Sequence, residues 1–540
     1  MQAQALTKNQ TLEKASQAPG QGTLSPYALL TPQQSGVMDK AAGALLPALM
    51  EQAGAGAARL LLERGPELGL GEQARVVVLA GPGNNGGDGY VMARHLATAR
   101  RDVTVVSAGE PRTELAKAAR QAWSGAVIPL ASFQPDSLLH AEGIVVDALF
   151  GAGFKGDLPS APAAFLQGFK HRMALDMPSG VDGLSGDCAP GVAPCQLTAA
   201  FGRLRPGQLL LPGKAVCGVV KAVPMTMPPE SIQAMEDAFP AAILRTPTEP
   251  VPAEAEGLLR FFHNAPGLWR LPLQTPLDNK YTRGVVSVIG GGVMSGAGRL
   301  SLMGARRSGC GLARVAVQAQ SAMIYILGAA GAIIDELTPS VTLQTLLEDK
   351  RRHTWVCGPG LTSSEVMASF PVLLAAKRQV VADAGTLDWA AGAPEKLRGA
   401  AVITPHAGEF ARVFNTPRML GLLKRNRPLA ALEAARLTGA VCVLKGSDSV
   451  VAAPDGRVAI NTHASDGLAT AGSGDVLSGV VGTCLAVGMA PWEAACAAVW
   501  LHGQAGQAAS AREGGWPLAE DVAAELGRAR GLATTLQQAG

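Results

Sequence analysis

The sequence predicts two α/β domains, each built on a parallel sheet that helices cover on both faces. Short apolar runs alternate with helical stretches along most of the 540 residues. The alternation occurs twice, and a proline-rich segment separates the two series. At roughly 100–200 residues per domain, the length allows two to four domains. Strands that alternate with helices are typical of parallel sheets, so we expect an α/β fold in both halves.

The composition excludes several classes of protein. Apolar residues make up 48% of the chain and charged residues 16%, which argues against a disordered chain. Lys and Arg number 46 against 43 Asp and Glu, so we expect no nucleic-acid partner. The eight cysteines form no Cys-x-x-Cys pair, and the apolar flanks of Cys357, Cys442 and Cys484 predict buried, reduced thiols.

Neither a secretory signal nor a membrane span is expected. The N-terminus is polar, without the apolar core of a signal peptide. The longest uncharged apolar run, 476–492, is shorter than the ~20 residues that a membrane span needs, and we interpret it as a buried helix. We therefore predict a cytoplasmic protein that binds no membrane.

The first alternation predicts a domain over 25–225. Its helices are expected at 46–62, 90–100 and 113–123. Its strands are expected at 76–80, 103–107, 144–148, 173–176 and 219–223. The segment 226–265 follows and contains two dense proline clusters, which suit neither a helix interior nor a central strand. We expect an interdomain linker there.

The second alternation predicts a domain over 266–535. Two Gly- and Ala-rich helices are expected within 474–512. The strands are expected at 285–289, 313–317, 354–357, 380–383, 401–404, 441–445 and 450–453. We find no repeat between the two halves, so the two domains should differ.

A glycine-rich turn follows the first predicted strand. The sequence from Gly81 to Gly89 reads GPGNNGGDG, and an apolar helix is expected to begin near Tyr90. Backbone amides in such a turn favour a phosphate group. The motif also matches the G-x-G-x-x-G of dinucleotide-binding dehydrogenases, which is one alternative. Against it, Asn84, Asn85 and Asp88 place polar groups where bare backbone is expected. A tight turn with Asp88 as a helix cap is another alternative.

Two further strand ends carry acidic residues. Asp147 ends the strand at 144–148, and Asp176 ends the strand at 173–176. Ligands gather at the carboxyl ends of strands in an open parallel sheet, so these residues should converge with the glycine-rich turn. Asn85, Asp147 and Ser179 offer hard oxygen ligands for an alkali or alkaline-earth cation, and Asp176 is the candidate acid/base.

These motifs resemble the NAD(P)H-hydrate epimerase domain, which implies a Rossmann-like three-layer fold. The resemblance covers residues 27–225 and implies K⁺ held by Asn85, Asp147 and Ser179, with Asp176 facing the reacting ring. The residues implied to surround the hydrated coenzyme are Asn84, Asn85, Gly86, Gly87, Asp88, Gly151, Ala152, Gly153, Phe154, Lys155, Gly156 and Asp157. The chain departs from the family pattern at Gln52, Ala200 and Arg205, where Asn, Thr and Lys are usual.

A second glycine-rich turn precedes a long apolar helix. Gly472-Ser473-Gly474-Asp475 would direct backbone amides toward a phosphate, with Asp475 as a base beside it or as a helix-start carboxylate. Lys445 and the small residues after it end another strand and suit nucleotide phosphates and ribose. His406 either contacts substrate or is structural. The sequence contains no Walker A motif, which excludes P-loop chemistry.

This half resembles the ribokinase-like ADP-dependent NAD(P)H-hydrate dehydratase domain over residues 270–530. The resemblance implies a hydrate site lined by Ala297, Gly360, His406 and Asp475. It implies that Lys445, Gly446, Ser447, Asp448, Ser449 and Gly474 hold the nucleotide with Mg²⁺. The chain departs from the family pattern at Thr362, Ala407 and Gly385, and we expect the change at Gly385 to loosen a polar contact.

The two-domain order resembles the bifunctional NAD(P)H-hydrate repair enzymes. Such a protein epimerises R- and S-NAD(P)HX and dehydrates the S-epimer at the expense of ADP, giving AMP and phosphate. Its partners would be NAD(P)HX and ADP, and we expect a homo-oligomer. The alternatives are a ribokinase-like small-molecule kinase and a non-catalytic N-terminal nucleotide-binding module, which the departures at Gln52, Ala200 and Arg205 favour.

Overall fold

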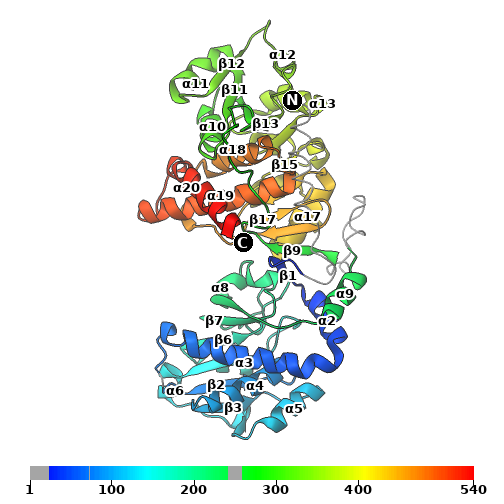
Figure 1. The fold of residues 1–540 in the computed structure, drawn as a ribbon, viewed down its shortest axis with the longest axis vertical. Coiled ribbons are helices and arrows are strands. Elements are labelled where there is room, and N and C mark those ends of the chain that lie inside the picture. Colours follow the sequence, from blue (N-terminus) through cyan, green and yellow to red (C-terminus); the bar gives the residue numbers. More distant parts are fainter. Residues whose placement is uncertain (1–23, 72, 241–257, 540) are drawn as a thin grey trace. The chain divides into compact units, whose positions relative to one another are not determined.

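The computed structural model describes residues 24–71, 73–240 and 258–539. These residues form two compact units (Figure 1). The first comprises the described residues up to 180 together with Ala189–Arg205 and Val216–Pro240. The second comprises those from 258 onward together with Val181–Cys188 and Pro206–Ala215. Each unit contains its own sheet, so the predicted α/β class is confirmed in both.

The elements up to residue 240 follow the predicted alternation. In chain order they are β1 (Ala28–Leu29), α2 (Pro32–Ala42), α3 (Leu46–Arg64), β2 (Val76–Ala80), α4 (Asn84–Thr98), β3 (Val103–Ser107), α5 (Glu114–Ala122), β4 (Val127–Pro129), α6 (Ser137–Glu142), β5 (Ile144–Ala148), α7 (Ser160–Gln167), β6 (His171–Leu175), β7 (Leu197–Phe201), α8 (Gly213–Cys217), β8 (Val219–Val223) and α9 (Pro229–Ala238). The seven-stranded sheet of the first unit has the order β4-β3-β2-β5-β6-β7-β8, and its strand pairs are parallel.

The central strand β2 shows why the first unit has three layers. Successive side chains of a strand point to opposite faces. Val76 and Val78 belong to a core cluster with α3 and α4, whereas Val77 and Leu79 belong to a second cluster with α7. Both faces of the sheet are therefore buried under helices, which explains the continuous apolar sequence of this strand.

Helix α4 begins earlier than predicted. Its first residue is Asn84, not Tyr90, so the two asparagines and Asp88 lie in the helix and not in a loop. The prediction was wrong because glycines are poor helix formers, and three of them stand here. They permit close packing instead: a Cβ on Gly86 would lie 1.9 Å from the carbonyl oxygen of Gly81. The turn proper is therefore only Gly81–Gly83.

The elements from residue 258 onward form the larger unit. They are β9 (Arg260–His263), β10 (Val285–Gly290), α10 (Ser295–Arg307), β11 (Leu312–Gln318), α11 (Ala322–Gly328), β12 (Ile333–Leu337), α12 (Leu343–Leu347), β13 (Thr354–Cys357), α13 (Ser363–Ala375), β14 (Gln379–Ala382), α14 (Gly385–Trp389), β15 (Val402–Ile403), α15 (Ala407–Val413), α16 (Pro417–Arg425), α17 (Arg427–Thr438), β16 (Val441–Leu444), β17 (Val450–Ala452), β18 (Arg457–Ile460), α18 (Ser473–Ala486), α19 (Pro491–Arg512) and α20 (Ala519–Ala539). The strands lie in the order β9-β18-β17-β16-β15-β14-β13-β10-β11-β12, and only β17 runs antiparallel to its neighbours.

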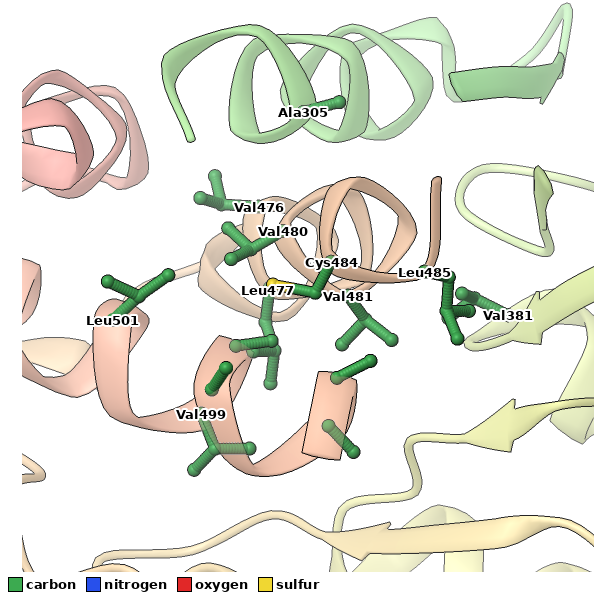
Figure 2. Close-up of a cluster of buried hydrophobic side chains, with 14 of the residues drawn as sticks. Ala305, Val381, Val476, Leu477, Val480, Val481, Cys484, Leu485, Val499 and Leu501 are labelled. Atoms are coloured by element: carbon green, nitrogen blue, oxygen red, sulfur yellow. The ribbon is translucent and has the colours of Figure 1, made fainter. Parts of the chain in front are cut away.

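Helix α18 is the centre of the second core. Figure 2 shows Val476, Val480 and Cys484 along this helix, with Ala305 on α10 nearby. The apolar run 476–492 thus comprises most of α18 and the start of α19. Within the described residues, no helix is long and apolar enough to cross a membrane. The cysteines expected to be buried thiols, Cys357, Cys442 and Cys484, are free and buried.

The predicted linker, 226–265, contains regular structure at both ends. Helix α9 begins at Pro229, where a missing N–H costs nothing because the first turn has no acceptor for it. Strand β9 begins at Arg260 and pairs with β18. The residues between them, 241–257, lie outside the described residues. A high proline content therefore did not exclude a helix in this segment.

Candidate active sites

A cavity of about 1100 Å³ opens in the first unit at the carboxyl end of its sheet. Of the residues predicted there, those lining it are Asn84, Asn85, Asp88, Gly151, Ala152, Gly153, Phe154 and Asp176. Others lie elsewhere: Gly86 and Gly87 are buried in helix packing, and Lys155, Gly156 and Asp157 are exposed beyond the lining. The structure thus brings most of the predicted polar residues into one cavity, but Lys155 and Asp157 lie outside its lining.

Asp176 follows β6 directly and has a strained backbone. Its φ is +60°, a conformation that few residues other than glycine adopt and that often marks functional positions. The expected strand over 173–176 therefore ends one residue early, at Leu175. The carboxylate accepts the backbone N–H of Ala152 at 2.7 Å, and Oδ1 lies 3.5 Å from Nε of Arg205. Donors thus surround Asp176 on two sides.

Two further carboxyl groups belong to this cavity. Asp88 lies on α4, and burial together with the charges of Asp176 and Asp39 raises its pKa well above the usual value. Asp39, which lies on α2, was not predicted as a site residue. A capping box between Thr31 and Gln34 starts that helix, and this signal was available in the sequence.

Asp147 and Ser179, two of the three residues expected to hold K⁺, form a buried hydrogen-bonded pair. Ser179 donates its hydroxyl to Oδ1 of Asp147 at 2.6 Å and its backbone N–H to Oδ2 at 2.8 Å, and the N–H of Leu149 also donates to Oδ1. Burial raises the pKa of Asp147, and the bonds from Ser179 oppose this. The Asn85 side chain is buried, and neither its oxygen nor its nitrogen has a hydrogen-bond partner among the described residues.

These observations fit an alkali cation. An ionised carboxylate offers about four acceptor sites, and Asp147 uses three of them for protein donors. The unsatisfied amide oxygen of Asn85 is a further hard ligand that otherwise remains buried at a cost.

A buried lysine and two carboxyl groups form an ion-pair network in the second unit. Lys445 follows β16, and its Nζ lies 2.9 Å from Asp383 and 3.6 Å from Glu409. Burial alone would lower the pKa of Lys445, but these two carboxylates raise it. Asp383 and Glu409 were not predicted as site residues, although both follow strands and carry charge.

Asp475 lies in the first turn of α18, beside this network. Burial raises its pKa to about 7; Asp383 and Glu409 add to the rise, and Lys445 opposes it. A carboxyl group with this pKa is half ionised at neutral pH, which suits a general base. A Cβ on the neighbouring Gly474 would lie 3.2 Å from Nζ of Lys445, so the glycine turn and the lysine meet.

Helix α10 contacts the same turn. Ser301 donates its hydroxyl to the carbonyl oxygen of Asp475 at 2.9 Å, and Ala297 lies about one turn earlier on α10. A Cβ on Gly360 would lie 3.3 Å from that of Ala297. The structure therefore places Ala297, Gly360 and Asp475 on adjoining segments.

His406 caps helix α15. Its Nδ1 accepts the backbone N–H groups of Gly408 and Glu409 at 2.9 and 3.3 Å. The ring is half exposed, and Nε2 lies 3.7 Å from the Glu409 carboxylate. His406 thus has a structural role whether or not it also contacts substrate.

Interactions within and beside the loop 446–449, which follows Lys445, fix its conformation. Ser449 donates its hydroxyl to the carbonyl oxygen of Gly446 at 2.7 Å. Asp448 is buried, and its Oδ1 lies 3.3 Å from Nε of Arg427. The Ser449 hydroxyl also accepts the backbone N–H of Gly446 at 3.1 Å, so both backbone groups of Gly446 are used within the loop. The described residues hold no cluster of three or more His, Cys, Asp or Glu suited to a metal. That is compatible with Mg²⁺ arriving on nucleotide phosphates.

Comparison with known proteins identifies the family. One family model, described as YjeF-related protein N-terminus, matches residues 47–207, and another, described as NAD(P)H-hydrate dehydratase, matches 286–527. A bifunctional NAD(P)H-hydrate repair enzyme of Pyrobaculum aerophilum is 33% identical over 510 residues, covering 89% of this chain and 93% of that protein. The chain belongs to the bifunctional NAD(P)H-hydrate repair enzyme family. It contains both the epimerase and the dehydratase domains of that family.

Other relatives carry the same description. The repair enzyme of Moorella thermoacetica is 30% identical over 523 residues, covering 90% of this chain and 93% of that protein. The structure of an ADP/ATP-dependent NAD(P)H-hydrate dehydratase from Bacillus subtilis, co-crystallised with ATP and Mg²⁺, covers 49% of this chain and 94% of that one, at 26% identity and a TM-score of 0.42. Family membership overturns the dehydrogenase alternative for the first glycine motif.

Proposed function

We propose that this protein interconverts R- and S-NAD(P)HX in its first unit and dehydrates S-NAD(P)HX in its second. ADP would be the phosphoryl donor, and the products would be NAD(P)H, AMP and phosphate. The observation that carries the proposal is that each site contains carboxyl groups suited to transfer protons. Asp88 and Asp176 line one cavity, and Asp475, with a pKa of about 7, adjoins Lys445 in the other unit.

The first site suits reversible loss of the substrate hydroxyl. Asp88, whose pKa is raised by burial and by the neighbouring carboxylates, donates a proton to the hydroxyl at C6 of the nicotinamide ring, and the C6–O bond breaks to release water. The ring nitrogen stabilises the cation that remains. Water then adds to the opposite face of C6 and gives its proton to Asp176. Because both carboxyl groups line one cavity, a proton returned from Asp176 to Asp88 completes the cycle.

Potassium would support the first site. Asn85, Asp147 and Ser179 would hold the ion through oxygen atoms, and it would supply positive charge near the phosphates or ring of the substrate. The protein's own contribution is to fix these oxygens: Ser179 is tied both to Asp147 and to the backbone N–H of Phe150, at 2.9 Å.

The second site suits phosphorylation followed by elimination. Asp475 removes the proton of the C6 hydroxyl, and that oxygen attacks the terminal phosphorus of ADP, releasing AMP. The C6–O bond then breaks with loss of a proton from C5, and phosphate departs. Hydroxide is a poor leaving group, whereas phosphate is a good one. Backbone amides at Gly472–Gly474 and Mg²⁺ would stabilise the phosphoryl charge.

The remaining assignments are part of the same proposal. The hydrate site of the second unit would include Ala297, Gly360 and His406. The nucleotide would contact Lys445, Gly446, Ser447, Asp448, Ser449 and Gly474. A homo-oligomer in the cytoplasm stays a prediction.

The decisive experiment incubates the protein with mixed NADHX epimers, Mg²⁺ and either ADP or ATP. We expect recovery of NADH absorbance from both epimers, with one phosphate released per NADH. Release of a stable phosphorylated product instead would indicate a kinase.

The Asp176→Asn variant then tests whether epimerisation and dehydration take place at separate sites. We expect epimerisation to fall by about 10²-fold or more, because the group that accepts the proton is gone. Dehydration of the S-epimer in the same sample should stay at the wild-type rate and is the internal control. Unchanged epimerisation would contradict the role of Asp176.

A further inference from the structure

A carboxylate with no assigned role, Asp39, lies in the cavity of the first unit. Helix α2 carries it, and Ser35 precedes it by about one helical turn, so both face the cavity from the same side of the helix. Both residues lie before residue 47, where the match to the N-terminal family model begins. The family match therefore gives this helix no role in the site.

Arg205 links helix α2 to Asp176. Its Nη1 donates to the hydroxyl of Ser35, and its Nη2 lies 3.5 Å from Oδ1 of Asp176. The guanidinium is buried. Burial raises the pKa of Asp39, and the charge of Arg205 opposes this rise. Two carboxylates from different elements, α2 and the end of β6, therefore share one buried cation.

The cavity has few other charges. Within the described residues, the charged groups lining it are Asp39 on α2, Asp88 on α4, Asp176 after β6, and Arg203 and Arg205 after β7. Arg203 donates to the carbonyl oxygen of Pro26 at 3.3 Å. Full ionisation would place three carboxylates against two guanidinium groups, so one carboxyl group retains its proton at low cost.

We propose that Asp39 is a positioning residue of the epimerase site, which acts through Arg205 and Asp88 and ensures that Asp88 holds the cavity's proton. The inference rests on the proposed function of the first unit. Arg205 contacts Asp176 and, through Ser35, the helix that carries Asp39, whereas the charges that act on Asp88 are those of Asp176 and Asp39. The charge of Asp39 adds to the cost of ionising Asp88. Without the charge of Asp39, Asp88 would lose its proton at a lower pH, and a smaller fraction of the enzyme could donate that proton.

The test compares Asp39→Asn with the wild type in epimerisation of NADHX as a function of pH. A proton donor loses activity as pH rises through its pKa. We therefore expect the alkaline limb of the variant's rate profile to move to lower pH by about 0.5–1 unit. Activity on the acidic side of the limb should remain close to that of the wild type. Asp39→Glu, which restores the charge, should return the limb toward its original position.

Controls separate this role from a structural one. Asp237→Asn removes an exposed carboxylate from the neighbouring helix α9 and should leave the limb unmoved. Retained epimerisation on the acidic side of the limb reports that the first unit is folded, and dehydration of the S-epimer reports the same for the second. Asp39→Ser is a second charge-removing variant. A limb that stays at the wild-type pH in both variants overturns the inference, whatever the rate. A wild type that does not epimerise at all overturns the proposed function, and the inference with it.

Discussion

The two active sites contain similar groups in opposite arrangements. In the first, the buried cation Arg205 faces Asp39 and Asp176, and Asp88 has a strongly raised pKa. In the second, the cation Lys445 contacts Asp383 and Glu409, and Asp475 has a pKa of about 7.

The placement of the cation distinguishes an acid from a base. The charges that act on Asp88 are those of carboxylates, which together with burial raise its pKa and favour the protonated form that can donate. Asp475 lies beside Lys445, whose charge lowers its pKa, so it is partly ionised at neutral pH and can accept a proton. The same kinds of residue thus support proton donation in one unit and proton removal in the other.

The largest effect should follow from Asp475→Asn. An amide cannot take the hydroxyl proton, so we expect dehydration to fall by about 10²–10⁴-fold. Epimerisation, measured in the same sample, should keep its wild-type rate because Asp475 belongs to the other unit. Loss of both activities would contradict the division of labour between the two sites.

A smaller effect, on pH dependence, should follow from Lys445→Gln. The lysine lowers the pKa of Asp475, so its removal should raise that pKa. Dehydration needs the ionised carboxylate, and its acidic limb, expected near pH 7, should move to higher pH by about one unit.

The matched control for this experiment is Lys424→Gln. It removes an exposed lysine from α16 and should not move the limb. A limb of the Lys445 variant at the wild-type pH would remove Lys445 from the explanation of the Asp475 pKa.

The smallest effect on activity should follow from Gly385→Ala, which tests packing beside Asp383. A Cβ at Gly385 would lie 2.3 Å from the carbonyl oxygen of Leu361, and backbone cannot easily move. We expect a loss of about 1–3 kcal/mol in the free energy of unfolding, seen as a lower Tm in a thermal melt. Gly531→Ala, in open space on α20, should leave the Tm equal or higher. A Tm unchanged by Gly385→Ala would mean that this backbone adjusts freely.

Five strands, β2, β3, β5, β8 and β13, have the predicted bounds. β2, β5 and β13 are fully buried, whereas β8 is largely exposed; all five are rich in β-branched or aromatic residues except for one or two positions. Other strands were not predicted because their sequences lack that signal. β12 is an exposed edge strand with two acidic residues, and β7 is rich in alanine. Their pairing partners, not their own composition, make them strands.

Candidate site residues could be proposed from the sequence where they stand in a motif at the end of a strand or the start of a helix. Asp147 and Asp176 were proposed from strand ends, and Asp475 from the glycine-rich turn before an apolar helix. Asp39 and Glu409 were not, because each acts through a partner distant in sequence: Asp39 through Arg205, and Glu409 through Lys445. Such pairs arise only when helices and strands pack, and a single sequence does not display them. The expectation that Gly385 loosens a polar contact also missed the tight backbone packing at this position.

The close approach of α4 to its own preceding turn has a practical meaning for mutagenesis. Adding a single methyl group at Gly86 would push the helix away from the Gly81 carbonyl and carry Asn85 and Asp88 with it. In a scan of all single substitutions, replacements of Gly86 would therefore reduce activity as strongly as replacements of an aspartate that transfers protons. Intolerance at that position would reflect a shortage of space, because Gly86 does not line the cavity.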